Sequence, residues 1–392
     1  MSKKLFLQNH VKKQIKELFI SVWVENFAMT LLTLFVPVYL WTLNYPIWMI
    51  GYYFLITYVA YFLVLPFGAK LAAKIGYTHT IAFSMPINVL FYISLYGVTF
   101  WPSMFYVSAV LYALSKAFYY VPYYADFSTF GGQRQRGREI AIMYVVGQLT
   151  IFGAPLIAGT ILSELSFAWL FGIGSVLLLI SVIPLFGSPD TPTHEKVPYL
   201  EIYRKFFAKE NRRRFVTFLG FGEELIAMTV WPIYVFIIVG NFLTFGAVLT
   251  ASTVVSSVFL LLTGKLTDKI SRARVVKGTS LIYFLSWFPK LFITTPLGVF
   301  LTDSVGQFSK TALMIPMSAV MYSEAKHSYK EKVLLGSMMF EMGYIPSKII
   351  ASLIIMGVGY YMNDLRFLLI VGAFFTLFYF FMHEKSKKAS EA

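Results

Sequence analysis

The chain of 392 residues is 58% hydrophobic and 18% aromatic, whereas charged residues make up only 13% of it. Soluble domains are about 45–50% apolar and about 25% charged, so this composition excludes a soluble enzyme and a disordered chain. The chain contains no cysteine, which excludes a disulfide-stapled module, thiol chemistry and cysteine-bound zinc. Its net charge is +14. Such an excess of positive charge is typical either of a protein that binds nucleic acid or of a membrane protein with basic cytoplasmic loops. The positions of the basic residues decide between the two.

Long stretches hold no Asp, Glu, Lys or Arg, namely 26–69, 75–115, 165–189 and 225–264. A membrane-spanning helix needs about 20 apolar residues, because lipid offers its backbone no hydrogen bonds. Clusters of Asn, Gly, Pro and Ser divide the longer stretches into separate spans. The pattern predicts an all-α polytopic membrane protein with twelve transmembrane helices, at residues 18–43, 46–69, 79–100, 103–125, 139–163, 166–187, 215–239, 245–264, 278–295, 298–323, 333–358 and 364–383.

The basic residues lie on one side of these predicted spans. The two termini and the alternate loops hold 28 of the 33, whereas the opposite side holds Arg366 alone and four lysines fall inside spans. Cytoplasmic loops are enriched in Lys and Arg, so both termini are expected in the cytoplasm. The basic residues are thus distributed by membrane topology and are not gathered on one face of the protein, which excludes a nucleic-acid-binding protein.

A polar stretch in the middle of the chain separates six predicted helices from six. It places Tyr199, Ile202, Tyr203 and Phe206 opposite basic residues at helical spacing, which predicts an amphipathic helix on the membrane surface. We therefore expect a first six-helix bundle at residues 1–187, a cytoplasmic linker at 188–214, and a second bundle with a short cytoplasmic tail at 215–392.

Three short motifs occur in both halves in the same order, displaced by 199, 195 and 194 residues. The first begins at Glu25 and again at Glu224, the second contains Lys70 and Lys265, and the third pairs Ser115-Lys116 with Ser309-Lys310. In the third motif a proline follows each lysine by six residues, at Pro122 and Pro316. Parallel repeats of six helices are typical of one transporter architecture.

The loop after the eighth predicted helix reads Gly264-Lys-Leu-Thr-Asp268-Lys269-Ile-Ser-Arg272. It resembles the G-x-x-x-D-[RK]-x-G-[RK] signature of the major facilitator superfamily, although the equivalent loop of the first half has Ala73 in place of the Asp. The resemblance implies two six-helix bundles with a central cavity lined mainly by helices 1, 4, 7 and 10. It further implies that Gly264, Asp268, Lys269 and Arg272 latch the cytoplasmic ends of neighbouring helices.

Several charged residues fall inside predicted spans, where each costs at least about 2.5–3.5 kcal/mol and therefore usually faces a cavity or a partner. At 1.5 Å per residue, Glu25 and Lys116 lie roughly 10 and 14 Å above the cytoplasmic ends of their helices. The same arithmetic places Glu224 and Lys310 roughly 14 and 20 Å above theirs. We therefore predict two pseudo-symmetric carboxylate–lysine pairs, Glu25–Lys116 and Glu224–Lys310. Each pair either exchanges with a proton or an anionic solute, or is a static brace between helices.

Other polar residues share faces with these lysines. Tyr112, Tyr119 and Tyr123 share one face of helix 4 with Lys116. Gln307 likewise shares a face of helix 10 with Lys310, so the three tyrosines and Gln307 are candidate solute contacts. Because tyrosine is abundant in this chain, packing between helices is the alternative role for each of these tyrosines. Asp303 is expected as a solvated helix end, Lys290 either extends outward or acts in function, and Glu341 and Lys348 are expected to brace the bundle. Pro122 and Pro316 are expected to kink their helices.

These features favour a secondary active transporter that moves a small anionic or zwitterionic solute by alternating access, coupled to protons and acting as a monomer. No phosphate-binding loop for an ATP-driven pump and no metal-binding cluster for a membrane enzyme is found, and no cofactor or metal is predicted. A flippase for lipid or lipid-linked precursors on the same scaffold, and a membrane-embedded enzyme, remain the alternatives. Import and export are equally compatible with the sequence, as are H⁺ and Na⁺.

Overall fold

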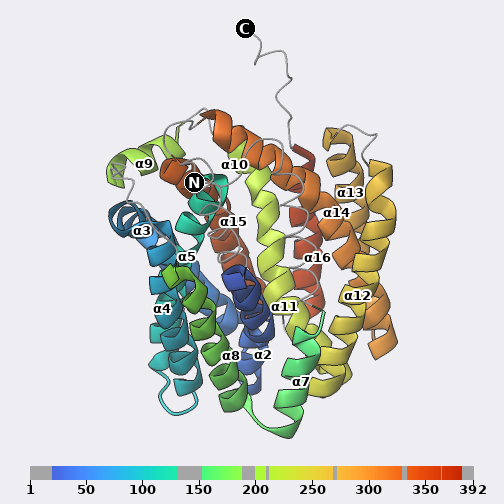
Figure 1. The fold of residues 1–392 in the computed structure, drawn as a ribbon. Coiled ribbons are helices and arrows are strands. Elements are labelled where there is room, and N and C mark those ends of the chain that lie inside the picture. The colour runs from blue at the N-terminus through green and yellow to red at the C-terminus, as the bar shows by residue number, and fades with distance from the viewer. Residues whose placement is uncertain are drawn as a thin grey trace, which may run out of the picture.

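The structure is a computed structural model that describes residues 20–129, 152–187, 199–208, 212–267, 272–328, 333–362 and 364–381. Every regular element in these ranges is a helix. Helices α3, α4, α5 and α8 of the first half lie on the left in Figure 1 and α12 to α14 lie on the right, whereas α7 of the first half lies beside α12. Helix α15 belongs to the second half but packs against α3 and α5 of the first.

The first half forms a helix over Ile20–Thr42, whose last part is α2 (Phe35–Thr42), and then α3 (Ile47–Ile75), α4 (Tyr77–Gly97), α5 (Met104–Thr129), α7 (Ala154–Glu164) and α8 (Phe167–Val182). The turn before α3 contains Asn44 in a left-handed conformation and Pro46 at the helix N-cap, at the break that the sequence predicts. Helix α3 continues past the predicted end at residue 69 until Gly76, which has a φ of 97°. An apolar run marks the bilayer, whereas a helix ends only where the backbone must turn.

The second half begins with α10 (Arg212–Phe218) and α11 (Gly222–Val239), joined by a short 3₁₀ turn, and continues with α12 (Phe242–Thr267), α13 (Arg272–Ser286), α14 (Pro296–Ser328), α15 (Val333–Tyr361) and α16 (Leu365–Thr376). Helix α13 ends earlier than predicted, and a 3₁₀ turn begins at Pro289. Proline has no N–H to donate and so does not continue the α-helix.

Eight of the described helices are long and apolar enough to cross a bilayer, and α7 and the segment Leu365–Phe381 are shorter apolar helices. Helix α13 has only 15 residues, and α14 carries Asp303 and Lys310 along its length. The architecture is therefore all-helical and polytopic within the described residues, and the count of twelve spans stays a prediction.

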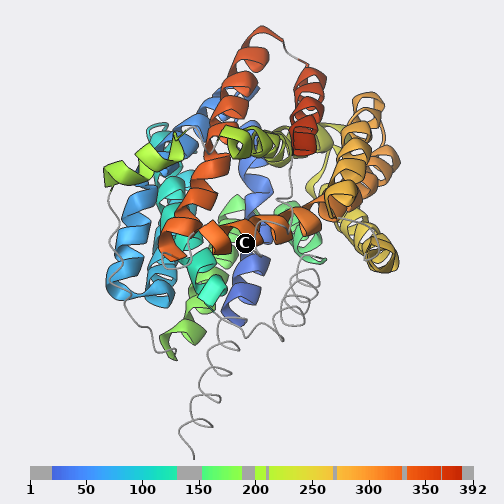
Figure 2. The same cartoon turned by 90° about the horizontal axis from the view of Figure 1, so that it is seen from above.

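The two halves meet mainly along two pairs of helices, α3 with α15 and α7 with α12, and α15 also contacts α5 while α11 contacts α2. At the contact of α7 with α12 the backbones are very close. A Cβ on Gly246 of α12 would lie 2.2 Å from the carbonyl oxygen of Pro155, and one on Gly159 of α7 would lie 2.4 Å from that of Phe242. Only glycine permits this approach. In the view from above, α12 and α13 lie on the opposite side of the molecule from α3 and α4 (Figure 2).

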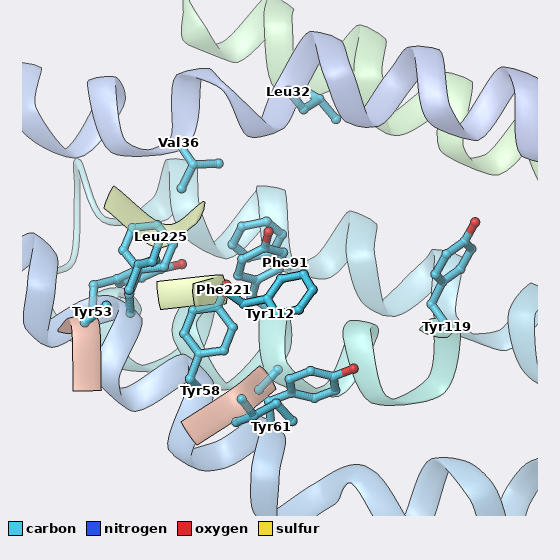
Figure 3. Packing of buried hydrophobic residues seen from close by; sticks show 14 of the residues in the cluster. Leu32, Val36, Tyr53, Tyr58, Tyr61, Phe91, Tyr112, Tyr119, Phe221 and Leu225 are labelled. Atoms are coloured by element: carbon cyan, nitrogen blue, oxygen red, sulfur yellow. The ribbon is translucent and has the colours of Figure 1, made fainter. Parts of the chain in front are cut away.

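Aromatic side chains fill the core of the first half. The rings of Phe91 and Tyr112 stack with centroids 4.5 Å apart, and Tyr53 meets Phe105 edge-on at 5.1 Å. Figure 3 shows Phe91 and Tyr112 beside Tyr58 and Tyr61, with Tyr119 further along its helix. Ring pairs of this kind add about 0.5–1.5 kcal/mol each beyond the area they bury, so the rings hold α3, α4 and α5 in a defined register.

The linker forms the predicted amphipathic helix, α9 (Tyr199–Phe206). Ile202 and Phe206 of this helix are buried, and the Phe206 ring packs against Phe62 of α3. The expected place of the helix on the membrane surface stays a prediction. The hydroxyl of Tyr203 donates to the Phe62 carbonyl at 2.7 Å. Pro66 lies four residues further along α3 and has no N–H for that carbonyl, so the linker supplies the donor that the proline lacks.

Candidate functional site

A group of four charged side chains occupies the centre of the second half. Glu223 and Glu224 lie in the first turn of α11, Lys310 on α14 and Lys348 on α15. The Lys310 ammonium lies 3.2 Å from Glu223 and 3.5 Å from Glu224. The Lys348 ammonium lies 2.7 Å from the other oxygen of Glu224. The predicted partners Glu224 and Lys310 are thus brought together, as members of a network that joins three helices.

The Glu223 carboxylate also accepts hydrogen bonds from two phenols, from Tyr283 at 2.7 Å and from Tyr379 at 3.4 Å. Its side chain is fully buried, and that of Lys348 is almost fully buried. Buried charges persist only when ion pairs and hydrogen bonds satisfy them together, and removal of one partner is strongly destabilising. This network therefore holds α11, α13, α14 and α15 together as one unit.

The first half holds its charges differently. The Glu25 side chain is buried and accepts a hydrogen bond from Tyr119 at 2.7 Å. The predicted Glu25–Lys116 ion pair is absent, because no acidic oxygen of the described residues lies within 4.0 Å of the Lys116 ammonium. That prediction rested on helix depth, which fixes height along the membrane but not the direction of a side chain.

The Lys116 ammonium lies over two aromatic rings of its own helix, at 4.7 Å from the centre of Tyr112 and 5.1 Å from that of Tyr120. Such contacts are worth about 0.5–2 kcal/mol and leave the three N–H donors free for an oxygen ligand. Both Glu25 of the first half and Glu341 of the second lie within its electrostatic reach. Lys116 is therefore a partly buried cation near the contact of the halves, without an ion pair in the described protein.

Glu341 on α15 is fully buried and lies at the contact between the halves. One of its carboxyl oxygens accepts hydrogen bonds from two phenols, that of Tyr61 on α3 and that of Tyr344 on its own helix. The sequence predicts a brace at this position. The contact with Tyr61 links the halves, and Lys348, also predicted as a brace, pairs with Glu224 on α11.

The predicted tyrosine stripe divides into different environments. Tyr112 is only 3% exposed and packs on Phe91, so its ring belongs to the core and touches Lys116 from that side. Tyr119 binds Glu25, and Tyr123 stacks on Tyr119 with ring centroids 5.4 Å apart. Shared spacing placed the three on one helix face, but neighbouring helices cover that face unevenly.

Gln307 and Asp303 form a separate cluster toward the N-terminal end of α14. Gln307 donates to Asp303 at 2.6 Å and accepts from Thr253, while the indole of Trp231 donates to Asp303 at 2.9 Å. Gln307 thus contacts Asp303 rather than the Lys310 network. The expectation of a solvated Asp303 is wrong, because the side chain is buried and its oxygens are satisfied within the bundle.

Lys290 lies beside this cluster and is also buried, so it does not extend outward as one interpretation of the sequence held. Its ammonium lies 4.1 Å from the ring centre of Trp231 and 4.6 Å from that of Trp287. Two indole faces replace part of the hydration that the charge loses on burial.

The remaining predicted positions are only partly described. Gly264 lies within α12 and Arg272 begins α13, whereas Asp268 and Lys269 lie outside the described residues. Helices α5 and α14 run through Pro122 and Pro316 without interruption. The latch and the kinks therefore stay predictions.

Sequence reasoning missed the roles of Glu223, Tyr283 and Tyr379. Glu223 is adjacent to Glu224, and two neighbouring acids at the start of one apolar helix are a signal that both need partners. The phenols left no such signal, because tyrosine is abundant in this chain, with 26 copies.

A family model described as Major Facilitator Superfamily matches residues 18–222, which is more than half of the chain. The chain belongs to the major facilitator superfamily. No protein among those with curated functions matches the sequence. Membership, together with the apolar spans, makes this chain a multi-pass integral membrane protein and a transporter rather than an enzyme.

Solved structures of transporters share the fold over nearly the whole chain. The nucleoside transporter NupG is 15% identical with a TM-score of 0.68, covering 94% of this chain and 97% of its own. An auto-inhibited POT family peptide transporter is 13% identical with a TM-score of 0.71, covering 95% and 98%. The human organic anion transporter MFSD10 is 13% identical with a TM-score of 0.64, covering 95% and 99%. At such identities the likeness shows the fold and leaves the solute open.

Proposed function

We propose that this transporter moves a small anionic or zwitterionic solute by proton-coupled alternating access, and that Lys116 binds the negative group of the solute. The observation that carries the proposal is the unpaired Lys116 ammonium, close to charged groups of both halves. An anion at Lys116 would gain charge-assisted hydrogen bonds without first breaking an ion pair. The transporters of similar fold handle nucleosides, organic anions and peptides, a range that includes such solutes.

The charge balance of the central residues supports coupling to protons. The central carboxylates are Glu25, Glu223, Glu224 and Glu341, and the central lysines are Lys116, Lys310 and Lys348. With every group ionised, the centre carries one negative charge in excess, and a bound anion would add another. A low-dielectric site disfavours such an imbalance, so uptake of an anion together with protons is favoured.

The two carboxylates at repeat-related positions have different parts in this proposal. Glu25 has a phenol but no cation beside it, so it gains or loses a proton without breaking an ion pair. Glu224 stays ionised between Lys310 and Lys348 and keeps the second half in one piece. Proton exchange at Glu25 would then alter the field at Lys116 and thus the affinity for the solute.

A thermal-shift panel on the purified protein tests the solute site. Carboxylates, phosphates, zwitterionic amino acids, nucleosides and lipid-linked precursors are screened at an acidic and a neutral pH, and hits are repeated with Lys116→Ala. The proposal expects an anionic or zwitterionic hit whose stabilisation is lost in Lys116→Ala and kept in the control Lys70→Ala, which changes an exposed lysine at the end of α3. Stabilisation by lipid-linked compounds alone would support the flippase alternative instead.

Uptake into proteoliposomes with an imposed pH gradient tests the coupling. Glu25→Gln is expected to abolish gradient-driven accumulation while solute exchange persists, because the fixed neutral side chain no longer carries a proton. Gradient-driven uptake that is unchanged in both Glu25→Gln and Glu224→Gln would contradict a coupling role for either carboxylate. A matching experiment with a Na⁺ gradient separates the two ions.

We further propose twelve spans in two six-helix units, cytoplasmic termini and a monomeric transporter. Because the chain has no cysteine, single cysteines introduced at exposed loop positions can be labelled without background. Labelling from one side of sealed vesicles is expected at residue 208 and to fail at residue 166. Light scattering in detergent should give the mass of one chain.

A further inference from the structure

Glu341 is the buried carboxyl that the proposed transport cycle leaves unused. Its side chain has no exposure to solvent, and no cation of the described residues lies within 4.0 Å of it. The phenols of Tyr61 and Tyr344 both donate to the same oxygen, Oε2. The other oxygen, Oε1, is buried and has no hydrogen-bond partner among the residues that the structure describes.

This arrangement suits a neutral carboxyl better than a carboxylate. A carboxylate has about four acceptor sites and here meets two donors on one side only. A buried charge without a cation is far more costly than a buried neutral group with one unmet hydrogen bond. The contrast with Glu224, which is held by two lysines, shows what an ionised glutamate receives elsewhere in the same molecule.

Glu341 lies where its protonation would affect the contact between the two halves. Tyr61 lies on α3 in the first half and Glu341 on α15 in the second, so their hydrogen bond crosses the contact between the halves. The two helices pack along much of their length. Tyr61 also directly precedes Phe62, whose carbonyl receives the Tyr203 hydroxyl of the linker. The bond therefore joins both halves and a segment of α3 to which the linker is attached.

We propose that Glu341 carries a proton when α3 and α15 are closed against each other, and that release of this proton to water parts the two helices. Once ionised, Oε1 requires a donor or a cation. Among the described residues, the titratable and charged groups around it are Tyr58 and Tyr61 on α3, Lys116 and Tyr120 on α5, and Tyr344 and Lys348 on α15. Lys348 is already paired with Glu224 of α11. Of the groups described, Lys116 after a movement of α5 can then satisfy the new charge, and water can do so where the helices part.

This inference deepens the proposed proton coupling and relies on the proposed function only for its place in transport. It concerns helix separation rather than solute binding, so its test needs no solute. Failure of the test would leave the solute site at Lys116 untouched, and failure of the solute panel would leave the proton at Glu341 untouched.

The test measures the distance between α3 and α15 in lipid nanodiscs. Spin labels are attached at Leu63→Cys and Ile350→Cys, two exposed positions in a chain that has no other cysteine. The distance is measured at about pH 5.5 and about pH 8.5, which lie below and above the raised pKa values of most buried carboxyl groups. The wild type should give a short distance between the labels at the lower pH and a longer one at the higher pH. Glu341→Gln, a neutral side chain of the same size, should keep the short distance at both. Glu164→Gln, which changes an exposed glutamate at the end of α7, is the control and should respond as the wild type does.

Two further measurements test whether the change in distance comes from Glu341 and its hydrogen bond to Tyr61. Infrared difference spectra between the two pH values should show a neutral-carboxyl band that Glu341→Gln lacks and Glu164→Gln retains. Tyr61→Phe removes the cross-half hydrogen bond and should give the longer distance at both pH values. The proposal is overturned if the wild-type distance does not change with pH, if Glu341→Gln changes as the wild type does, or if the carboxyl band survives in Glu341→Gln.

Discussion

The two halves of the chain hold their buried charges in different ways. In the second half, two glutamates and two lysines form ion pairs of 2.7, 3.2 and 3.5 Å. In the first half, Glu25 has a single phenol and Lys116 rests on two rings, without an ion pair between them. The repeat relates Glu25 to Glu224 and Lys116 to Lys310, so equivalent positions have diverged. The four-residue network of the second half balances its own charge, whereas Lys116 and Glu25 of the first half form no ion pair with any described residue.

The largest expected effect compares the two repeat-related glutamates. Glu224→Gln removes the charge that balances Lys348, and we expect a loss of about 3 kcal/mol of stability, the lower end for a broken buried pair because part of Glu224 is exposed. Glu25→Gln breaks no ion pair and should change stability by less than about 1 kcal/mol. Denaturant or thermal unfolding in detergent measures both. Equal losses in the two variants would erase the contrast between the halves.

A second expected effect concerns the contact through which the halves move against each other. Gly246→Ala places a Cβ 2.2 Å from the Pro155 carbonyl oxygen and should cost about 1–3 kcal/mol, because both backbones must shift. Gly172→Ala on α8 meets nothing within 4 Å and should be neutral or stabilising by up to about 1 kcal/mol. Similar unfolding midpoints for the two variants would mean that α7 and α12 are not in close contact.

Several features of the fold could be predicted from the sequence for simple reasons. The turn at residues 43–46 lies where the apolar run meets Asn44 and Pro46, and α9 forms where four apolar residues recur at helical spacing. The family match is centred on the first half, although the recognisable signature loop lies in the second. The matched region therefore includes the half whose loop motif departs from the signature.

The partners of the buried charges could not be predicted, because helical spacing gives a face and a height but not a neighbour. Lys348 was expected to brace the bundle from the helix face that it shares with Glu341, but nothing indicated that its partner would be Glu224 on α11. Asp303 was expected in water, yet Trp231 and Gln307 enclose it. Both outcomes depend on which helices pack together, and helical spacing along the sequence does not specify that.

A third prediction concerns the attachment of the linker to the first half. Tyr203→Phe removes the hydroxyl that satisfies the Phe62 carbonyl and should cost about 1 kcal/mol. Tyr360→Phe alters an exposed tyrosine that makes ring contacts only and should stay within about 0.5 kcal/mol. Limited proteolysis of the linker should accelerate in the first variant alone. Unchanged proteolysis would show that α9 does not depend on this bond.

The smallest expected effect concerns an exposed ion pair of the second half. Asp364 caps α16 and binds Arg366, whose hydrogen bond holds the pKa of Asp364 below its usual value of 3.8. A lowered pKa adds stability above the unfolded value, and this is lost as the pH falls through the folded value. Asp364→Ala should therefore cost about 0.5–1 kcal/mol near neutral pH and less in acid. A cost that grows on acidification would contradict this sign.

The affinity of the solute found in the panel, measured by calorimetry for Lys116→Ala and Lys310→Ala, tests the division between the halves most directly. The account predicts at least a roughly tenfold weaker affinity for Lys116→Ala, about 1.4 kcal/mol or more, with stability almost unchanged. Lys310→Ala should keep its affinity within about threefold and lose stability instead. An intact affinity in Lys116→Ala, with the loss in Lys310→Ala, would contradict the account and place the solute in the second half.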